Sequence, residues 1–484
     1  MTVKVVIIGA SLAGLFAAAA VAAAGAQAMI IERDVLPDDP MPRKGVPQGR
    51  QPHVLLHRGL LAAEELLPDI RLDLLSHGAV PLDTGTWAWL GEYGWSPTWI
   101  PAYETVSATR PLLEHLVRER VRRLAGVTLH EGVRVNELHR NARDWRVVCD
   151  DATTLEADLV IDASGRGSRL PHWLTGLGIS VSEPLMVDAH LGYACRTYRA
   201  IGEPPIEIAV MIAATPQTGR GALAIPVEDA NWLVVAIGYA DHRPSRSVAE
   251  FDEFLATLPD PAIADLTKHL EPVGDIAIHR QTGNRRNRYG RSWTWPAGLL
   301  AVGDAYCAFN PVFGQGITVA ACQALLIRDA LKHDRTPAGR GPLATRRLQR
   351  RIGAAADLPW SVATSEDLRH PSSSGSQTWI QRLLGLWTAQ LARLVAHGDR
   401  DAYLAFARVY HLMAAPAMLF NPRVIYSACR AAVRGMPEQN PRPRALNALA
   451  ANRSPQSTWE RDASGTLGAC TSWWSTMIKP YGIP

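Results

Sequence analysis

The sequence predicts an α/β fold with a parallel sheet, a separate antiparallel sheet and a helical region toward the C-terminus. Three observations predict it. A strand–helix–strand pattern occupies residues 3–31, β-rich segments with turns between them occupy residues 189–239, and helical patterning prevails from Pro342 onward. Two more strand-and-turn segments, at 158–168 and 299–305, resemble the first pattern, so we expect the two sheets to be interleaved along the chain.

Composition and charge exclude several classes of protein. A chain of 484 residues is long enough for about three structural units, and 47% apolar with 20% charged residues is ordinary globular usage. Fifty basic against 46 acidic residues leave a net charge of +4, which predicts no binding to nucleic acid or anionic lipid. The six cysteines form no C-x-x-C pair and no metal-ligand cluster, so we expect no metal site, free thiols and a cytoplasmic location.

The run from Val5 to Ile31 contains no charged side chain and is long enough to cross a bilayer, so a membrane helix and a signal peptide must both be weighed. Its internal pattern argues against both. Val3–Ile8 is a β-branched strand, Leu12–Ala24 is an Ala-rich helix, and Ala28–Ile31 is a second strand. A buried parallel strand is apolar on both faces, so the run predicts a βαβ unit and no transmembrane segment.

The turn after the first strand fits the dinucleotide fingerprint G-x-G-x-x-G with one departure. Gly9 and Gly14 match the outer glycines, and Ser11 replaces the middle one. Gly9 permits a tight turn, Gly14 lets the helix pack on the strand, and the helix N-terminus meets a pyrophosphate. Glu32 stands 18 residues beyond Gly14, where its carboxylate can accept from ribose hydroxyls. The pattern predicts a Rossmann-like domain whose cofactor contacts are Gly9, Ser11, Leu12, Ala13, Gly14, Glu32 and Arg33.

The later segments Asp158–Ser168 and Leu299–Ala305 are buried strands that end in Asp/Gly turns. Together with the fingerprint they resemble the class A FAD-dependent monooxygenases of the aromatic-hydroxylase type. The resemblance implies that the turn from Asp162 to Gly165 lies where FAD and the nicotinamide cofactor approach. It also implies that Gly303 and Asp304 hold the ribityl chain, and that Arg110, at the start of a helix, contacts the flavin.

The loop Phe309–Thr318 is similar to the P-x-x-G-x-G loop of the same family and enters an apolar helix. Glycine N–H groups at a helix start can stabilise negative charge on the N1/O2 edge of a reduced flavin. The implied cofactor contacts in this loop are Pro311, Gly314, Gln315, Gly316 and Ile317.

A narrower resemblance covers residues 1 to about 370. The segment Met41–Gln48 followed by His53, the turn at Asp162, and Ile352–Trp360 resemble the bacterial polyether-pathway epoxidases. In that family FAD is reduced by NADPH, O2 adds to give a C4a-hydroperoxide, and its distal oxygen is delivered to double bonds of a polyene polyketide. The choice between NADPH and NADH stays open. Arg43, Lys44 and Arg166 are candidates to contact the cofactors.

Epoxidation by a flavin hydroperoxide needs no protein nucleophile and no metal, so we expect no catalytic side chain beyond the cofactor. His53 is expected to be a structural residue near the flavin. Trp87 and Trp89 belong to an aromatic-rich stretch, and either they line a tunnel for an apolar substrate or they pack the sheet against the core. The candidate substrate contacts are His53, Trp87, Trp89 and Phe309.

The resemblance also implies domain boundaries. We expect an FAD-binding domain of residues 1–80, 104–185 and 276–335, a substrate-binding domain of 81–103 and 186–275, a C-terminal helical region of 336–435, and a linker and tail of 436–484. Alternatives on the same fold are hydroxylation of an aromatic polyketide ring, flavin-dependent halogenation and isoprenoid reduction. A flavin-binding carrier is the non-enzymatic alternative, and the oligomeric state stays open.

Overall fold

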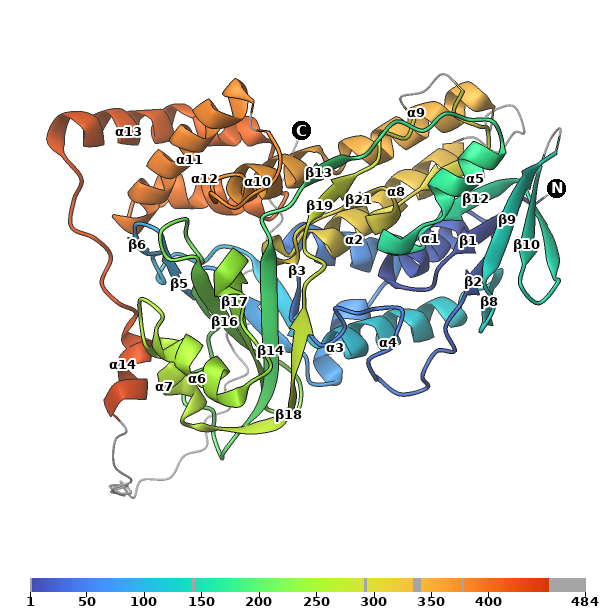
Figure 1. Ribbon diagram of the computed structural model, residues 1–484. Coiled ribbons are helices and arrows are strands. Elements are labelled where there is room, and N and C mark those ends of the chain that lie inside the picture. The colour runs from blue at the N-terminus through green and yellow to red at the C-terminus, as the bar shows by residue number, and fades with distance from the viewer. Residues whose placement is uncertain (1, 142–143, 291–293, 334–340, 377, 452–484) are drawn as a thin grey trace.

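The computed structural model describes residues 2–141, 144–290, 294–333, 341–376 and 378–451. The predicted α/β fold is confirmed. A parallel sheet with helices lies at the right of Figure 1, a larger, mainly antiparallel sheet lies at the lower left, and most of the C-terminal helices lie above that sheet. In the described part of the chain, no helix has both the length and the apolar character needed to cross a membrane.

A five-stranded parallel sheet is the centre of the first region, called here the parallel-sheet domain. Its strands in spatial order are β20 (Leu299–Ala301), β12 (Leu159–Asp162), β1 (Lys4–Ile8), β2 (Gln27–Glu32) and β8 (Val127–Glu131). One face packs against α1 (Leu12–Ala23), α2 (His57–Leu66), α3 (Ile70–Ser76), α4 (Arg110–Arg122) and α8 (Gly316–His333). The other face packs against β9 (Val135–Arg140), β10 (Trp145–Cys149), β11 (Thr154–Ala157) and α5 (Leu170–Gly176). Because both faces are covered, β1, α1 and β2 can form the predicted βαβ unit from a charge-free run.

A seven-stranded sheet forms the second region, called here the antiparallel-sheet domain. Its strands in order are β18 (Leu270–His279), β14 (Leu191–Ala200), β17 (Asn231–Tyr239), β16 (Arg220–Pro226), β15 (Val210–Ile212), β5 (Ala88–Gly91) and β6 (Gly94–Trp95). All neighbours are antiparallel except β15 and β5. The back face packs against α6 (Val248–Ala256), α7 (Ala262–Thr267) and α14 (Arg444–Ala451).

Two smaller sheets and several single turns of helix lie between the domains or beside them. The sheets are β3 (His53–Leu55), β7 (Glu104–Ala108) and β4 (Val80–Asp83), and β13 (Leu185–Val187), β19 (Asn284–Arg286) and β21 (Cys307–Ala308). The short 3₁₀ helices are η1 (Gly165–Gly167), η2 (Ala240–His242), η3 (Gly303–Ala305), η4 (Pro311–Phe313) and η6 (Pro416–Phe420).

The helices that follow are α9 (Pro342–Ala354), α10 (Asp357–Asp367), α11 (Trp379–Ala396), α12 (Arg400–Tyr410) and α13 (Pro422–Arg434). Helices α11 to α13 share a small core of their own, whereas α9 contacts α8 and β20.

Two expected boundaries differ from the structure. Strand β18 continues to His279, past residue 276, because it pairs with β14 as far as Tyr193. The segment 436–484, expected to be only linker and tail, contains α14, whose Leu446 and Leu449 are buried against the antiparallel-sheet domain. Residues 452–484 lie outside the described part.

Candidate functional site

The fingerprint turn joins β1 to α1 by close backbone contacts. Gly9 has a φ of +103°, and its N–H donates to the carbonyl of Ile31 at 2.8 Å. A Cβ on Gly14 would lie 1.8 Å from the carbonyl oxygen of Gly9, and a Cβ on Gly9 would lie 2.7 Å from that of Ala163. Both glycines are therefore required sterically, and they hold the start of α1 against the ends of β2 and β12.

Glu32 is buried at the end of β2, and its carboxylate shapes the turn. One oxygen accepts from the N–H of Ala10 at 2.7 Å, and the other accepts from the N–H of Asp34 at 3.0 Å. The side chain of Arg33 is half exposed. The structure thus brings Glu32 to the fingerprint turn, as predicted from its spacing, but does not bring the guanidinium of Arg33 there.

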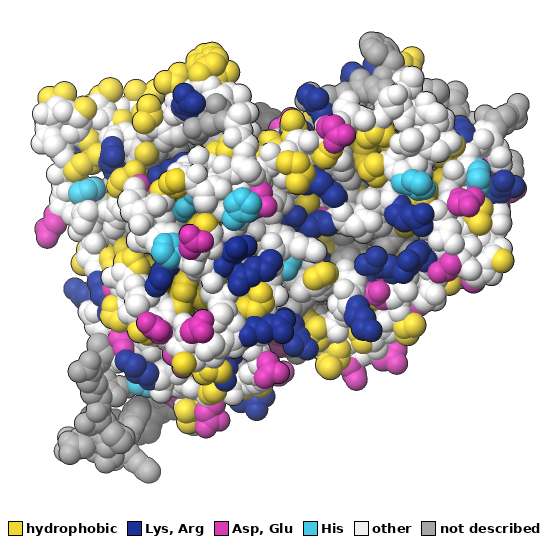
Figure 2. All heavy atoms as spheres, viewed as in Figure 1, with side chains coloured by type: hydrophobic (Ala, Val, Ile, Leu, Met, Phe, Trp, Pro, Cys, Tyr) yellow, Lys and Arg dark blue, Asp and Glu magenta, His cyan; other side chains and the backbone are white. Residues whose placement is uncertain are grey.

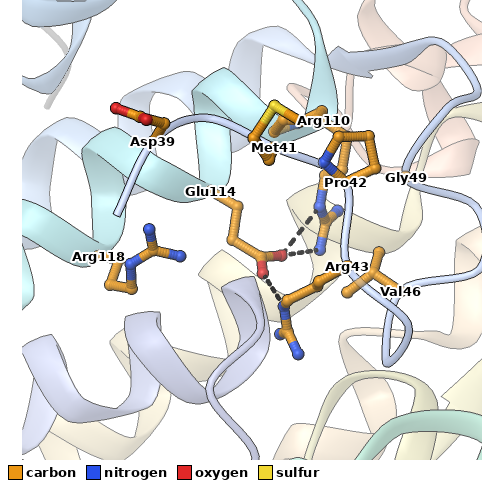
Figure 3. Close-up of a pocket in the computed structure, with 10 residues that line it drawn as sticks. Asp39, Met41, Pro42, Arg43, Val46, Gly49, Arg110, Glu114 and Arg118 are labelled. Atoms are coloured by element: carbon orange, nitrogen blue, oxygen red, sulfur yellow. Dashed lines mark hydrogen bonds and ion pairs between the residues drawn. The ribbon is translucent and has the colours of Figure 1, made fainter. Parts of the chain in front are cut away.

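An ion cluster lies beside Ser11, the first residue before α1. Figure 3 shows Arg43 and Arg110 converging on the carboxylate of Glu114. Glu114 accepts from Nε of Arg43 at 2.7 Å and from Nε and a terminal nitrogen of Arg110 at 3.2 and 3.1 Å. The Ser11 hydroxyl donates to Glu114 at 2.9 Å and accepts from Arg110 at 2.7 Å. Arg43 also donates to Asp34 at 2.8 Å.

This cluster is almost fully desolvated, which fixes its charge state. Burial alone would raise the pKa of Glu114, but the guanidinium groups of Arg110 and Arg43 outweigh burial and lower it. The pKa of Arg43 is raised, because Glu114 and Glu32 outweigh the opposing effect of burial. Arg43 and Arg110 thus lie next to the N-terminus of α1 among three carboxylates, those of Glu114, Asp34 and Glu32.

Helix α4 positions two members of this cluster. Thr109 caps the helix by accepting from the N–H of Leu112, and Pro111 lies in its first turn. Arg110 and Glu114 are one turn apart and therefore lie on the same side of α4. Glu114 was not predicted from the sequence, although its spacing from Arg110 was a usable signal.

The second turn, after β12, is organised by Asp162. Its buried carboxylate accepts from the N–H and hydroxyl of Ser164 and from the hydroxyl of Ser168, at 3.0, 2.5 and 2.5 Å. Burial raises its pKa, although the serine hydrogen bonds act against that shift. Gly165 has a φ of +78°, and a Cβ at this position would meet no atom within 4 Å, so its backbone is open to a ligand.

The third turn holds Asp304 on η3 after β20. Its carboxylate lies 3.5 Å from Nε of Arg166, whose terminal nitrogens donate to the carbonyls of Gly283 and Phe309. A Cβ on Gly303 would lie 2.8 Å from the Ala13 side chain, which places this turn against the fingerprint turn. The three predicted strand-end turns therefore meet at one edge of the parallel sheet.

The loop Pro311–Gly316 leads into α8 beside these turns. The carboxamide of Gln315 is buried, and neither of its polar atoms has a hydrogen-bond partner in the described part of the protein. The hydroxyl of Thr318, on the first turn of α8, is also buried without one. Such groups are costly unless a ligand or water completes them.

A buried polar network anchors this loop, and sequence analysis missed it. Asn310 accepts from the hydroxyl of Tyr193 at 2.7 Å and donates to Asp367 of α10 at 2.9 Å. Asn284 donates to the same carboxylate at 2.6 Å. Burial raises the pKa of Asp367 to about 7, although hydrogen bonds from Asn310 and Asn284 oppose the shift. Residues from both domains and from α10 thus meet at the start of the loop.

The structure places the expected substrate residues in different surroundings. Trp87 is buried on the sheet face that also carries Val54 and Val312 from the parallel-sheet domain. Trp89 makes edge contacts with Phe406 and Tyr410 of α12, at ring-centroid distances of 6.2 and 5.8 Å. Neither tryptophan packs on the back face.

Phe309 and Lys44 do not join this face. Phe309 is buried in the core of the parallel-sheet domain, with Tyr306 and Val319, and the expected contact of its side chain with substrate stays a prediction. Lys44 is exposed. His53 lies on β3, and its Nδ1 bonds the carbonyl of Gln51 at 2.8 Å. Burial, then the charge of Arg110, lowers the pKa of His53 to about 3, so the ring is neutral at physiological pH.

Comparisons with known proteins agree with this geometry. Residues 2–345 match a sequence family described as FAD binding domain. The chain belongs to this family. It is 33% identical over 359 residues to Protein Rv3254 of Mycobacterium tuberculosis strain H37Rv, covering 70% of this chain and 75% of that one. It is 25% identical over 424 residues to kynurenine 3-monooxygenase of Salinispora arenicola, covering 81% and 88%. The fold resembles that of CmlS, a flavin-dependent halogenase, with a TM-score of 0.61, 19% identity, and 85% and 78% of the two chains covered.

This FAD-dependent monooxygenase family is the one whose motifs the three turns match. The residues present fit FAD. The open backbone at Gly165, the amide of Gln315, which has no partner among the described residues, and the N-terminus of α1 supply contacts of the kind that a flavin dinucleotide uses. Bound there, FAD would lie along the turns at Gly9, Gly165 and Gly303.

Proposed function

We propose that this monooxygenase uses NADPH or NADH and O2 to epoxidise carbon–carbon double bonds of an apolar, polyketide-type substrate. When bound, FAD would supply the chemistry that activates O2 for transfer of one oxygen atom. The protein's own part is to hold the alkene against the flavin and to exclude water.

The observation that carries this proposal is the sheet face between the domains. It is built mainly from apolar side chains of β14, β16 and β17, with Trp87 at one side. Its ionisable groups are held neutral. Burial raises the pKa of Tyr193 and Tyr239 and lowers the pKa of His279. An alkene needs no base, and the mainly apolar side chains of this face suit a hydrocarbon substrate, which favours epoxidation.

Hydroxylation of an aromatic ring is the second candidate. It is supported by the similarity to kynurenine 3-monooxygenase over most of both chains. Asp367 is the buried carboxylate that we consider as a base for a phenol, but Asn284 and Asn310 already donate hydrogen bonds to it.

The positions of the lysine side chains argue against halogenation. Relay of hypohalous acid to a lysine requires that side chain inside the protein, and the four lysines in the described ranges are all exposed. Residues 293–295 have the sequence Trp-Thr-Trp, which is similar to the Trp-x-Trp signature of flavin-dependent halogenases. Trp295 is buried and stacked on Tyr289, and its indole N–H donates to the carbonyl of Leu299. Trp293 lies outside the described residues.

The test uses the FAD-loaded protein with squalene and with kynurenine as probes. Oxidation of NADPH or NADH that is coupled to O2 uptake, with one oxygen atom added to squalene by mass spectrometry, is the expected result. Oxygen added only to kynurenine would replace epoxidation by ring hydroxylation. Replacing Trp87 and Trp89 by Ala should weaken squalene binding and leave the flavin content intact. If neither NADPH nor NADH reduces the bound flavin with both probes present, the monooxygenase proposal is overturned and a flavin carrier is favoured.

A further inference from the structure

The C-terminal helices present an unusual surface to solvent. Of the 21 exposed large hydrophobic side chains in the described part of the chain, eleven lie between residues 379 and 433. Scattered exposed apolar residues are normal, but a concentration of them marks an interaction site. In Figure 2 hydrophobic side chains gather at the upper left, the end of the molecule where Figure 1 places α11 to α13.

The first half of α11 carries the densest part of this surface. Its exposed side chains are Trp379, Ile380, Leu383, Leu384 and Leu386, and the exposed fractions of Trp379 and Leu386 are 70% and 71%. These positions recur at spacings of three, four and seven residues, so they form one apolar side of the helix. The second half of α11 is anchored by Leu391, Leu394 and Val395 in the core that it shares with α12 and α13.

Local interactions, rather than packing, keep the exposed half helical. Thr378 accepts from the N–H of Gln381 at 3.2 Å, and the Gln381 side chain accepts from the N–H of Thr378 at 2.9 Å. This capping box satisfies two N–H groups at the start of α11 by local contacts. An apolar helix segment is therefore formed in advance, and the described residues leave it exposed.

Helix α13 adds a second apolar row and positive charge. Ile425, Tyr426 and Val433 are exposed on it, Val433 to 85%, and Arg423, Arg430 and Arg434 are exposed beside them. Trp387 of α11 stacks on Phe420, which lies just before α13, at a centroid distance of 5.4 Å. The two helices therefore belong to one surface.

The charge of this segment differs from that of the rest of the chain. Residues 378–435 contain seven arginines and two aspartates, a net charge of +5, whereas the remaining chain has 43 basic against 44 acidic residues. The expectation of no anionic-lipid binding rested on the net charge of the whole chain, and that average conceals a basic region.

We propose that the exposed face of α11 and α13 docks on an anionic lipid surface, with the helices lying in the membrane interface. Such helices combine an apolar side with arginines that pair with lipid headgroups. A second copy of this chain is a poorer occupant, because a twofold contact through this face would bring together the exposed arginines of α13 from both copies. The proposal is independent of the substrate proposed above.

The test is co-sedimentation of the FAD-loaded, full-length protein with vesicles. We expect binding to vesicles of phosphatidylcholine with about one third phosphatidylglycerol, much weaker binding to phosphatidylcholine alone, and loss of binding at high salt. The double variant Trp379→Ser/Leu383→Ser should bind at least about tenfold more weakly, since each buried large side chain contributes roughly that factor. Arg423→Gln/Arg434→Gln should lose most of the preference for the anionic vesicles.

A matched control replaces two apolar residues of similar exposure outside this face, Leu72→Ser/Ile201→Ser, and should bind like the wild type. Absence of wild-type binding to the anionic vesicles would overturn the proposal without recourse to any variant. A wild-type dimer that Trp379→Ser/Leu383→Ser dissociates, in a protein that ignores vesicles, would assign the face to a second copy instead. Equal losses in the control and test variants would also overturn it.

Discussion

Replacement of Glu114 by Gln tests the ion cluster beside Ser11. The carboxylate accepts four hydrogen bonds, three of them from Arg43 and Arg110. Gln keeps the size and one oxygen but loses the charge, and its amide nitrogen cannot accept from a guanidinium. Removing one partner from a buried ion pair costs about 3–5 kcal/mol, and because one oxygen remains we expect a loss of about 3 kcal/mol at neutral pH.

The pH dependence of this loss has a defined sign. The folded-state pKa of Glu114 is lowered from 4.5, so its stabilising effect is present above pH 4.5 and disappears as the pH falls through the folded pKa. The free energies of unfolding of wild type and Glu114→Gln, measured by urea denaturation, should therefore differ most at neutral pH and converge in acid. Glu119→Gln is the control on the same helix, because its partly exposed pairs with Arg122 and Arg123 should contribute less than about 1 kcal/mol.

Two results would refute this reasoning. A difference below about 1 kcal/mol at neutral pH would mean that Arg43 and Arg110 do not depend on Glu114. A difference that is constant with pH would mean that ionisation of Glu114 is not its source. The flavin content of the variant is a separate readout, and we expect it to be retained because the arginines remain beside Ser11.

Three further outcomes are expected. Gly14→Ala should fail to fold or lose flavin, since its Cβ would lie 1.8 Å from a carbonyl oxygen. Gly165→Ala should fold, and its free energy of unfolding should fall by only about 1 kcal/mol because of the positive φ at this position. Urea denaturation and flavin absorbance check both variants. Trp87→Phe should change stability by less than about 1.5 kcal/mol, because the buried indole N–H has no partner among the described residues; thermal unfolding measures it, and a larger loss would indicate an important hydrogen bond. Burial raises the pKa of Asp367 to about 7, so the free energy of unfolding should fall as the pH rises from about 4 to 7, and Asp367→Asn should flatten that part of the curve.

The sequence was sufficient for those features of the fold that depend on local pattern. The βαβ unit was predicted within one or two residues, because the buried strands and the Ala-rich helix have distinct periodicities. The segment Gly221–Tyr239 was expected to be β-rich, and it forms the two strands β16 and β17. Helix α14 was missed because its two buried leucines are stabilised by a distant domain, and the short apolar pattern does not indicate which surface they meet.

The same limit applies to the site. Gly9, Gly14 and Glu32 could be predicted because the dinucleotide fingerprint fixes their spacing within one unit of the chain. The burial of the Phe309 side chain could not, because the core that receives it is built from distant parts of the chain. Apart from Arg110, the hydrogen-bond partners given above for Glu114 and Asp367 are 57 to 103 residues away in sequence, so most of their environment exists only in the folded protein.

The placement of Asn310 explains how the three regions can act together. Its amide joins Tyr193 of the antiparallel sheet to Asp367 of α10, and its N–H donates to Asn284, while the next residue begins the loop that carries Gln315. A substrate that displaces Tyr193 would therefore pull on the same side chain that sets the position of this loop. Helix α10 in turn precedes α11, whose exposed half we assign to a lipid surface. If docking shifted α10, Asp367 and Asn310 would be the hydrogen-bonded connection between α10 and the loop. The polar network thus joins the antiparallel sheet, α10 and the loop that carries Gln315 through one set of buried hydrogen bonds.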